Sequence, residues 1–377
     1  MKNLVLRVGI IVLKIIYSVV KVLPVSDKVT FISRQSNDVP LDFRMLIDEI
    51  SRTYPQIKTI VLAKKLTMSM SGLLCYIFYT LRHIYHLATS KVVVVDGYCI
   101  PVSLLKHKKN VKIIQIWHAL GAVKKFGYQT LDKPSGSSRQ LAEMMKMHRN
   151  YDYVLAISDA TAKHFCEAFD VSESKIIKSG LPRVDYLLNV SSNSNEKIEE
   201  YYKFDHNKEC VLYAPTFRKG KKIPLEELVD KIDFDRFNLI VKLHPLDALT
   251  ANKSSVSGVV FDDKFSTYDL AKYCDRIITD YSALGIEISL LDKPLYYFIY
   301  DVDDYSDDPG MNIDLEAEMG KYAVRTADGL AEVLKEEYDS TLLDAFRDKY
   351  VGEQTGSCTA DLSEFIVSLI SSQKGEK

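Results

Sequence analysis

The sequence predicts an α/β protein with two domains, each built around a parallel β-sheet, and three observations support this class. Short apolar runs alternate with helical patterns along most of the 377 residues. Runs such as Lys91–Asp96 and Val111–Trp117 are almost continuously apolar, as strands buried on both faces require. The alternation restarts after a stretch rich in serine and asparagine at 189–196, which we interpret as a linker.

The first half contains six expected strands separated by expected helices. The strands are Lys28–Ser33, Ile57–Ala63, Lys91–Asp96, Val111–Trp117, Tyr153–Ile157 and Lys175–Ser179. The helices are Leu41–Thr53, Met68–Ala88, Ser137–Asn150 and a segment that ends at Phe169, for which Ser158 supplies the N-cap.

The second half repeats the design. The expected strands are Cys210–Ala214, Asn238–Leu243, Val259–Phe261, Arg276–Thr279 and Leu295–Ile299, and the expected helices include Tyr268–Tyr273 and Ser282–Leu291. Strands that alternate with helices form parallel sheets through right-handed crossovers. We therefore expect Rossmann-like domains at 26–190 and 205–355 and a C-terminal helix at 356–377. Two such domains facing across a cleft make the GT-B fold.

Several classes of protein lose support from motifs that the sequence lacks. No Gly-x-Gly-x-x-Gly follows a strand and no Gly-x-x-x-x-Gly-Lys-Ser/Thr occurs, which argues against dinucleotide oxidoreductases and P-loop enzymes. The six cysteines never approach a Cys-x-x-Cys spacing, so we expect neither a zinc site nor a disulfide framework. The absence of such a framework is typical of a reducing, cytosolic environment.

An acidic segment near residue 300 invites a metal interpretation. Its carboxylates are those of Asp301, Asp303, Asp304, Asp307 and Asp308. Hard cations prefer such oxygen ligands. We interpret the segment as a solvated acidic loop and expect neither a metal nor another cofactor.

The N-terminal segment 1–25 predicts an amphipathic helix at a membrane interface. It carries four Lys/Arg and no acidic residue, and Arg7, Lys14 and Lys21 recur at seven-residue intervals, which places them on one helical stripe. The remaining surface is apolar: Leu4, Val5, Val8, Ile11, Val12, Ile15, Ile16, Val19 and Val22. A spanning helix would bury the three charges, and no small-residue cleavage site follows. The alternative is a helix packed on the protein's own core.

A second amphipathic segment, Met68–Ala88, is better explained as a core helix. Its apolar residues recur at helical spacing, with Arg82, His83 and His86 close by. If it also faces lipid, the basic run 106–109 would extend the same surface, because cations are attracted to an anionic leaflet. A solvated loop at 106–109 explains that run equally well.

Chemically useful side chains follow four of the expected strands at their carboxyl ends, where open α/β sheets bind ligands. His118 follows Val111–Trp117, Arg218 follows the strand that ends at Ala214, and His244 follows the strand that ends at Leu243. The fourth run leads into Asp280–Tyr281–Ser282 and then a helical pattern. A strand that enters a helix presents free N–H groups and a positive dipole end, which suit a phosphate.

These segments resemble the CDP-glycerol glycerophosphotransferase family, and its teichoic acid primases in particular. The resemblance rests on Gln115–His118 with Lys124–Gly127, Gly180–Asp185, Tyr213–Arg218, Lys242–Pro245 and Thr279–Ser282, in the family's order. It implies transfer of glycerol phosphate or ribitol phosphate from a CDP-alditol to an undecaprenyl-diphosphate-linked saccharide, with release of CMP. It also implies an acceptor-binding first domain, a CDP-alditol-binding second domain and the cytoplasmic face of the cell membrane, with no nucleic-acid partner.

The resemblance also implies roles for the site residues. His118 is the expected general base and His244 the second catalytic histidine. Arg218, Thr216, Asp280 and Ser282 are expected to bind the nucleotide and its pyrophosphate, with Asp280 orienting the loop or a ribose hydroxyl.

Two departures and three alternatives accompany this interpretation. Ala119 stands where many relatives have glycine, and Ala283 where many have a second serine. Arg183 and Asp185 could form an internal ion pair instead of acting in catalysis. The other functions are a GT-B nucleotide-sugar glycosyltransferase of cell-envelope polysaccharide synthesis and a non-catalytic, nucleotide-binding membrane scaffold.

Overall fold

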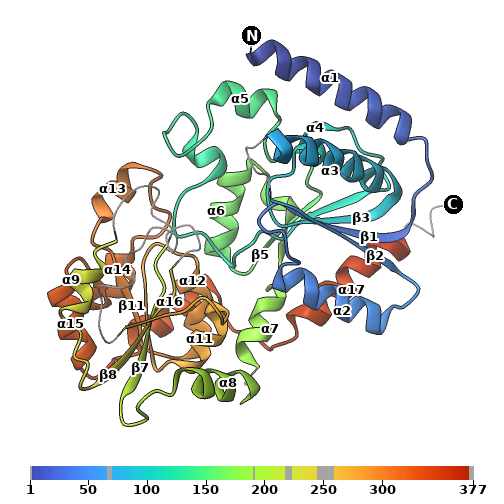
Figure 1. Cartoon of the computed structure of the whole chain (residues 1–377). Coiled ribbons are helices and arrows are strands. Elements are labelled where there is room, and N and C mark those ends of the chain that lie inside the picture. The colour runs from blue at the N-terminus through green and yellow to red at the C-terminus, as the bar shows by residue number, and fades with distance from the viewer. Residues whose placement is uncertain (1, 66–69, 190–191, 217–222, 244–258, 373–377) are drawn as a thin grey trace. The chain divides into compact units, whose positions relative to one another are not determined.

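The computed structural model describes residues 2–65, 70–189, 192–216, 223–243 and 259–372 (Figure 1). The chain divides into two compact units. The first comprises residues 1–120, 126–185 and 354–377, and the second comprises 121–125 and 186–353.

The first unit contains a parallel six-stranded sheet with the order β2-β1-β3-β4-β5-β6. Its strands are β1 (Ser26–Ser33), β2 (Lys58–Ala63), β3 (Ser90–Val95), β4 (Lys112–Gln115), β5 (Tyr153–Ala156) and β6 (Ile176–Lys178). From β1 the chain builds β2 on one side and β3 on the other, so the strand order reverses between β1 and β3. Ligands of open α/β sheets bind at the carboxyl ends of the strands beside such a reversal.

Helices cover both faces of this sheet. They are α1 (Lys2–Val20), α2 (Leu41–Thr53), α3 (Met70–Thr89), α4 (Ile100–Leu104), α5 (Arg139–Met144), α6 (Asp159–Phe169) and α17 (Cys358–Ser371), with 3₁₀ turns at Gly127–Thr130 and Glu173–Lys175. Helix α3 packs on β1 and β3, whereas α17 packs on α2 and β3 from the other face (Figure 1). Every residue of β3 is buried, in agreement with its apolar sequence.

The second unit has a parallel sheet with the order β12-β11-β10-β7-β8-β9. Its strands are β7 (Glu209–Tyr213), β8 (Phe237–Val241), β9 (Val259–Phe261), β10 (Arg276–Thr279), β11 (Leu295–Phe298) and β12 (Ala323–Val324). The chain lays down β8 and β9 on one side of β7 and then crosses to β10 on the other, so the strand order reverses between β7 and β10.

Short helices surround this second sheet. They are α8 (Ser192–Tyr202), α9 (Leu225–Val229), α11 (Thr267–Tyr273), α12 (Leu284–Ile288), α13 (Val302–Asp307), α14 (Leu315–Met319), α15 (Ala327–Lys335) and α16 (Thr341–Tyr350), and α7 (Pro182–Leu188) leads into this unit. 3₁₀ turns occur at Ser289–Leu291 and Gly320–Tyr322. The segment Gly121–Lys125 joins the unit through backbone hydrogen bonds from Lys125 to Gly310 and from Asn312 to Val123, at 2.9 and 2.8 Å.

The predicted α/β class with two parallel sheets is confirmed, and the expected strands are present with small shifts at their ends. The helix expected at 137–150 is wrong in length, because Lys146, His148 and Asn150 adopt left-handed backbone angles that end regular helix after α5. The stretch expected to be a linker enters helix α8 at Ser192. Strand β12 was missed because two residues carry no periodic signal.

Helix α1 packs on α3 and α4 along one side and exposes apolar side chains along the other. On the packed side Tyr17 is buried, and its hydroxyl group is hydrogen-bonded to Nδ1 of His107 at 3.0 Å. On the open side Ile11, Ile15 and Val19 are 56%, 60% and 66% exposed. None of the helices in the described part of the chain combines the length and apolar content that a bilayer crossing needs.

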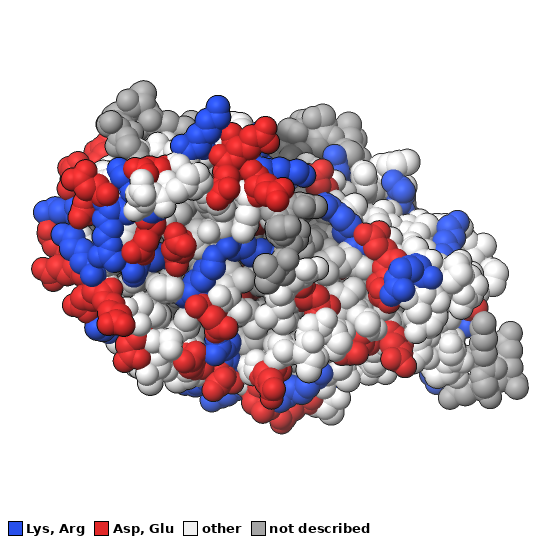
Figure 2. Space-filling view, turned by 90° about the horizontal axis from the view of Figure 1, so that it is seen from below, with Lys and Arg blue, Asp and Glu red and all other residues white. Residues whose placement is uncertain are grey.

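The charges on the surface are mixed. On the face shown in Figure 2, acidic and basic side chains are interspersed and neither sign forms a large continuous area. This distribution agrees with the small formal net charge of −2.

Candidate functional site

In the first unit, polar side chains gather where β1, β3 and β4 end. Ser33 is the last residue of β1, Asp96 follows β3, and His118 lies three residues after β4. The strands are parallel neighbours in the order β1-β3-β4, so these residues share one edge of the sheet, at the reversal of strand order.

The turn that carries His118 is held in an unusual backbone conformation. Trp117 has a φ of 61°, in the left-handed region that bulky residues rarely adopt. Its N–H group donates to the side-chain oxygen of Gln115 at 2.9 Å, and its indole stacks on Phe126 with centroids 4.5 Å apart. The His118 ring lies 4.1 Å from the indole. Strain of this kind persists where surrounding contacts over-determine it, and it clusters at functional sites.

Hydrogen bonding sets the tautomer of His118. Its Nδ1 lies 3.0 Å from the main-chain oxygen of Asp96, and a carbonyl can only accept, so Nδ1 carries the proton. In the neutral ring Nε2 is then left with its lone pair. The surrounding protein lowers the pKa of His118 to about 4, and the charge of Arg183 acts in the same direction. The imidazole is therefore neutral at pH 7, and its Nε2 lone pair is available to accept a proton.

A buried ion pair is hydrogen-bonded to the same turn. Arg183 donates from Nε to the Asp42 carboxylate at 3.0 Å and from Nη1 to the main-chain oxygen of His118 at 2.8 Å. Arg183 therefore forms an internal ion pair, but with Asp42 at the start of α2 and not with Asp185. Asp185 instead accepts the N–H groups of Cys358 and Thr359, at 3.0 and 2.7 Å, and so caps helix α17.

Asp96 is the residue of this edge that motif reasoning missed. Only 3% of it is exposed, and neither carboxylate oxygen makes a hydrogen bond of normal geometry. Burial raises the pKa of Asp96 to about 7, an effect that the nearby Ser33 hydroxyl group only partly opposes. The signal was present in the sequence, since Asp96 ends an apolar run just as His118 follows one.

In the second unit, the strand order reverses between β7 and β10, and predicted residues follow both strands. Asp280 is fully buried and accepts hydrogen bonds from the N–H group of Thr216 at 2.8 Å and from its hydroxyl group at 2.5 Å. The Thr279 hydroxyl donates to the Ala214 carbonyl at 2.9 Å, which joins the same two strand ends. The structure therefore brings Thr216 and Asp280 together and gives Asp280 a loop-orienting position.

Ser282 lies beside them at the start of a short helical segment. Its hydroxyl oxygen accepts the N–H group of Leu284 at 3.2 Å. The helix expected from Ser282 to Leu291 begins only at Leu284, ends at Ile288 and continues as a 3₁₀ turn to Leu291. A Cβ atom at Gly285 would overlap the Tyr297 side chain, so this segment packs closely on β11.

The remaining predicted residues have other outcomes. Arg218 and His244 lie outside the described residues, so their roles stay predictions. The acidic segment is largely helix α13 and not a loop. Oδ1 of Asp303, in this helix, lies 3.4 Å from Nη1 of Arg325, so the two side chains form an ion pair. Among the described residues, no group of three or more His, Cys, Asp or Glu side chains is arranged to hold a metal ion.

We predict that Asp280→Asn destabilises the protein. One amide oxygen replaces two carboxylate oxygens and the negative charge is lost, so the hydrogen bonds from the N–H and hydroxyl groups of Thr216 weaken and the free energy of unfolding falls by about 1–3 kcal/mol. Urea unfolding measures this change. Asp328→Asn is the matched control, because that side chain is 71% exposed and forms a surface ion pair with Lys231. Equal losses in both variants would contradict the prediction.

We predict that Asp96→Asn stabilises the protein at pH 8. The carboxyl titrates near 4 when unfolded and near 7 when folded, so the folded state binds more protons between these values and stability falls as pH rises through them. The variant loses this dependence and is more stable than the wild type at pH 8, by up to about 4 kcal/mol. Urea unfolding from pH 4 to 8 tests this, with the exposed Asp38→Asn as control. A pH slope that survives in Asp96→Asn would show the assignment to be wrong.

Comparison with known sequences identifies relatives of this chain. Residues 15–368 match the family described as CDP-glycerol:poly(glycerophosphate) glycerophosphotransferase. The chain is 30% identical over 365 residues to the teichoic acid ribitol-phosphate primase of Bacillus spizizenii, covering 93% of each chain. It is 27% identical over 298 residues to the teichoic acid glycerol-phosphate primase of Bacillus subtilis, covering 77% of each.

Comparison with solved structures confirms a GT-B-like fold. The wall teichoic acid polymerase TagF superposes with a TM-score of 0.76 at 20% identity, over 99% of this chain and 96% of that one. The UDP-GlcNAc 2-epimerase of Neisseria meningitidis superposes with a TM-score of 0.60 at 12% identity, over 93% and 100%. Because the family match covers nearly the whole chain, this protein belongs to the CDP-glycerol:poly(glycerophosphate) glycerophosphotransferase family.

Proposed function

We propose that this protein transfers glycerol phosphate or ribitol phosphate from the corresponding CDP-alditol to a hydroxyl group of an undecaprenyl-diphosphate-linked saccharide, releasing CMP. The observation that carries the proposal is His118, whose Nδ1 proton is committed to the Asp96 carbonyl while Nε2 remains basic. Membership of the family and similarity to teichoic acid primases support the same reaction.

The reaction is an in-line displacement at the β-phosphorus of the CDP-alditol. The acceptor oxygen attacks, the bond between the β-phosphorus and the bridging oxygen breaks, and CMP leaves with the electron pair. Nε2 of His118 takes the acceptor proton as the new bond forms, an effect of about 10²- to 10⁴-fold. The hydrogen bond to Asp96 and the tilted contact with the Trp117 ring hold the imidazole, so catalysis requires little reorientation.

The donor is assigned to the second unit. The Thr216 and Asp280 pair shapes the loop after β7, and Ser282 lies at the adjoining end of β10. Arg218 and His244 are proposed to stabilise the charge that develops on the diphosphate, since both follow strands of this unit in the sequence. We propose that cationic and N–H donors perform this task without a metal.

The assay for this function offers CDP-glycerol, CDP-ribitol and UDP-sugars to the purified protein together with a prenyl-diphosphate-linked saccharide. We expect CMP release and a product whose mass rises by one alditol phosphate or more. Two relatives are named for ribitol phosphate and glycerol phosphate, so the two CDP-alditols are compared directly. Release of UDP or UMP with a sugar-modified product would instead establish a glycosyltransferase.

We predict that His118→Asn lowers kcat by about 10²- to 10⁴-fold. Asparagine can still donate to the Asp96 carbonyl but has no basic nitrogen, so the fold is retained while proton transfer is lost. Rates are measured by CMP release, and circular dichroism checks the fold. A variant as active as the wild type would rule out His118 as the base, whereas a wild type that releases no CMP would favour the non-catalytic scaffold.

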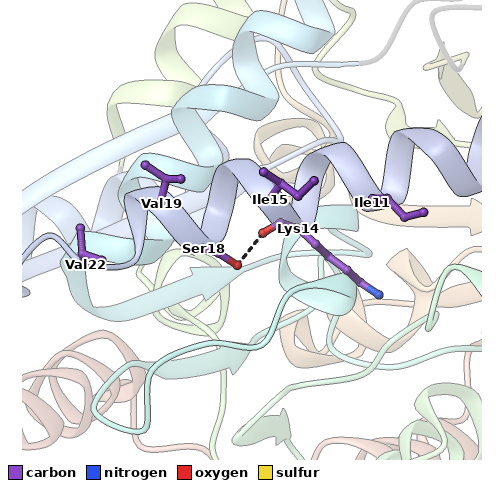
Figure 3. Close-up of a pocket in the computed structure, with 6 residues that line it drawn as sticks. All are labelled: Ile11, Lys14, Ile15, Ser18, Val19 and Val22. Carbon is purple, nitrogen blue, oxygen red and sulfur yellow. Dashed lines mark hydrogen bonds between the residues drawn. The ribbon is translucent and has the colours of Figure 1, made fainter.

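We also propose that the protein binds the cytoplasmic face of the cell membrane through α1. The exposed apolar side of this helix includes Leu4, Val8, Ile11, Val12, Ile15 and Val19, and Val22 is exposed in the turn that follows the helix. A shallow groove of about 620 Å³ runs along this side (Figure 3). It is lined by Ile11, Lys14, Ile15, Ser18, Val19 and Val22. Lys14 extends from the groove while the Ser18 hydroxyl group donates to the Lys14 carbonyl at 2.8 Å (Figure 3). Apolar side chains beside cations suit the boundary between headgroups and acyl chains.

We predict that replacing Ile11, Ile15 and Val19 by serine weakens binding to anionic vesicles by at least tenfold. The three side chains are exposed, so the fold is retained while the apolar area available to the acyl chains falls. Vesicle sedimentation measures binding. Leu141, Leu188 and Tyr201 are also exposed apolar residues, and their replacement by serine is the control. Equal binding by both variants and the wild type would exclude α1 as the membrane helix.

A further inference from the structure

A group of basic side chains lies where β1, β2 and the end of α3 meet. Lys28 and Lys58 are direct partners in the parallel register of β1 and β2. The Lys28 ammonium group donates to Nδ1 of His86 at 3.3 Å and to the hydroxyl group of Thr89 at 2.7 Å. Arg82 lies one helical turn before His86 on the same side of α3.

These groups repel one another. Burial lowers the pKa of Lys28 to about 8, and the charge of Lys58 contributes to the shift. Burial lowers the pKa of His86 to about 4, with contributions from Lys28, Arg82 and Lys58. No acidic side chain contributes to either shift, and within the described residues Lys28, Lys58 and Arg82 form no ion pair with a carboxylate. Like charges on directly paired strand residues are destabilising, so the cluster has an electrostatic cost.

The carboxyl end of α3 accounts for only part of this cluster. Cations are favourable at the negative end of a helix dipole, and Lys28 and Lys108 both donate to groups in its last turn. Lys58 and Arg82 are exposed, and Arg82 lies over the Tyr79 ring at 5.5 Å, one turn further from that end. Their contribution to the cluster fits an anion supplied from outside the chain.

Exposed apolar side chains border the cations. Ile77, Phe78 and Leu81 of α3 are 53%, 62% and 42% exposed, and Tyr85 is exposed beside Lys28, whose ammonium group lies 5.3 Å from the ring. On a helix, Ile77, Leu81 and Tyr85 form one stripe and Phe78 and Arg82 the next. A ligand that suits both stripes carries a negative charge joined to a hydrocarbon chain.

We propose that Lys28, Lys58, Arg82 and His86 form a binding site for the phosphate of an anionic glycerophospholipid, whose acyl chains lie along Ile77, Phe78 and Leu81. The exposed Lys58 and Arg82 contact the phosphate, and the buried Lys28 supports them from behind. Lys28 and Lys58 lie near the amino ends of their strands, whereas His118 follows the carboxyl end of β4, so this phosphate is not that of a substrate. The inference rests on the proposed membrane binding, since α1 packs on α3.

The test uses the full chain with vesicles of phosphatidylcholine, with and without phosphatidylglycerol. We expect Lys58→Glu/Arg82→Glu to bind phosphatidylglycerol vesicles at least tenfold more weakly than the wild type. Arg139→Glu/Lys163→Glu is the control, because both residues are exposed on the same unit and the change in net charge is identical. Lys58→Gln/Arg82→Gln repeats the measurement without adding charge. If the test and control pairs lost vesicle binding equally, the attraction would be a general one between the protein's positive charge and the anionic surface, and the proposed site would be excluded.

A second measurement separates lipid from free phosphate. Dihexanoyl phosphatidylglycerol, below its micelle concentration, should raise the unfolding temperature of the wild type but not of Lys58→Glu/Arg82→Glu. Inorganic phosphate that produced the same rise would overturn the lipid assignment. CMP release with a water-soluble acceptor should be unchanged in the variant, so loss of vesicle binding with intact transfer distinguishes this site from the proposed reaction. If the wild-type protein bound neither type of vesicle, both the α1 proposal and the lipid-site proposal would be wrong.

Discussion

The buried ion pair between Arg183 and Asp42 organises the first unit, because it connects three segments that are distant in the sequence. Asp42 begins α2, Arg183 begins α7, and the second guanidinium nitrogen reaches the carbonyl of His118. Two charges taken out of water are tolerated only when they meet each other with good geometry. The turn after β4 is therefore connected to the starts of α2 and α7 through the carbonyl of His118.

Both units place their polar residues according to the same constraint. In a parallel sheet the strand ends that share an edge leave unpaired backbone groups, and a reversal of strand order opens a space beside them. Asp96 follows one of the two strands at the first reversal, and Thr216 and Asp280 follow the two strands at the second. The first edge retains an unsatisfied carboxylate, whereas the second satisfies its carboxylate internally. This difference agrees with the proposed proton transfer at the edge of the first unit and with a loop-positioning role for Asp280 in the second.

The proposed membrane surface has a different physical origin. Helix α1 packs on α3 and α4, with Tyr17 hydrogen-bonded to His107, and its other side is apolar and exposed. That exposure is unfavourable in water and favourable in contact with acyl chains. The cations of α3, β1 and β2 repel one another, and the proposed lipid phosphate would offset this repulsion. Both features are unfavourable for an isolated protein and favourable at an anionic bilayer, so a single partner explains them.

The sequence by itself determined the α/β class, nearly all strands of both sheets and the position of His118 after β4, because apolar runs and strand-end residues are local signals. It also indicated the exposed apolar side of α1, since helical periodicity is local. Only the tertiary structure decided that Arg183 pairs with Asp42 and that Asp185 caps α17, because these partners are brought together by packing across the sheet. The left-handed turn at Trp117 and the buried carboxylate of Asp96 were likewise decided by surroundings that no local pattern records.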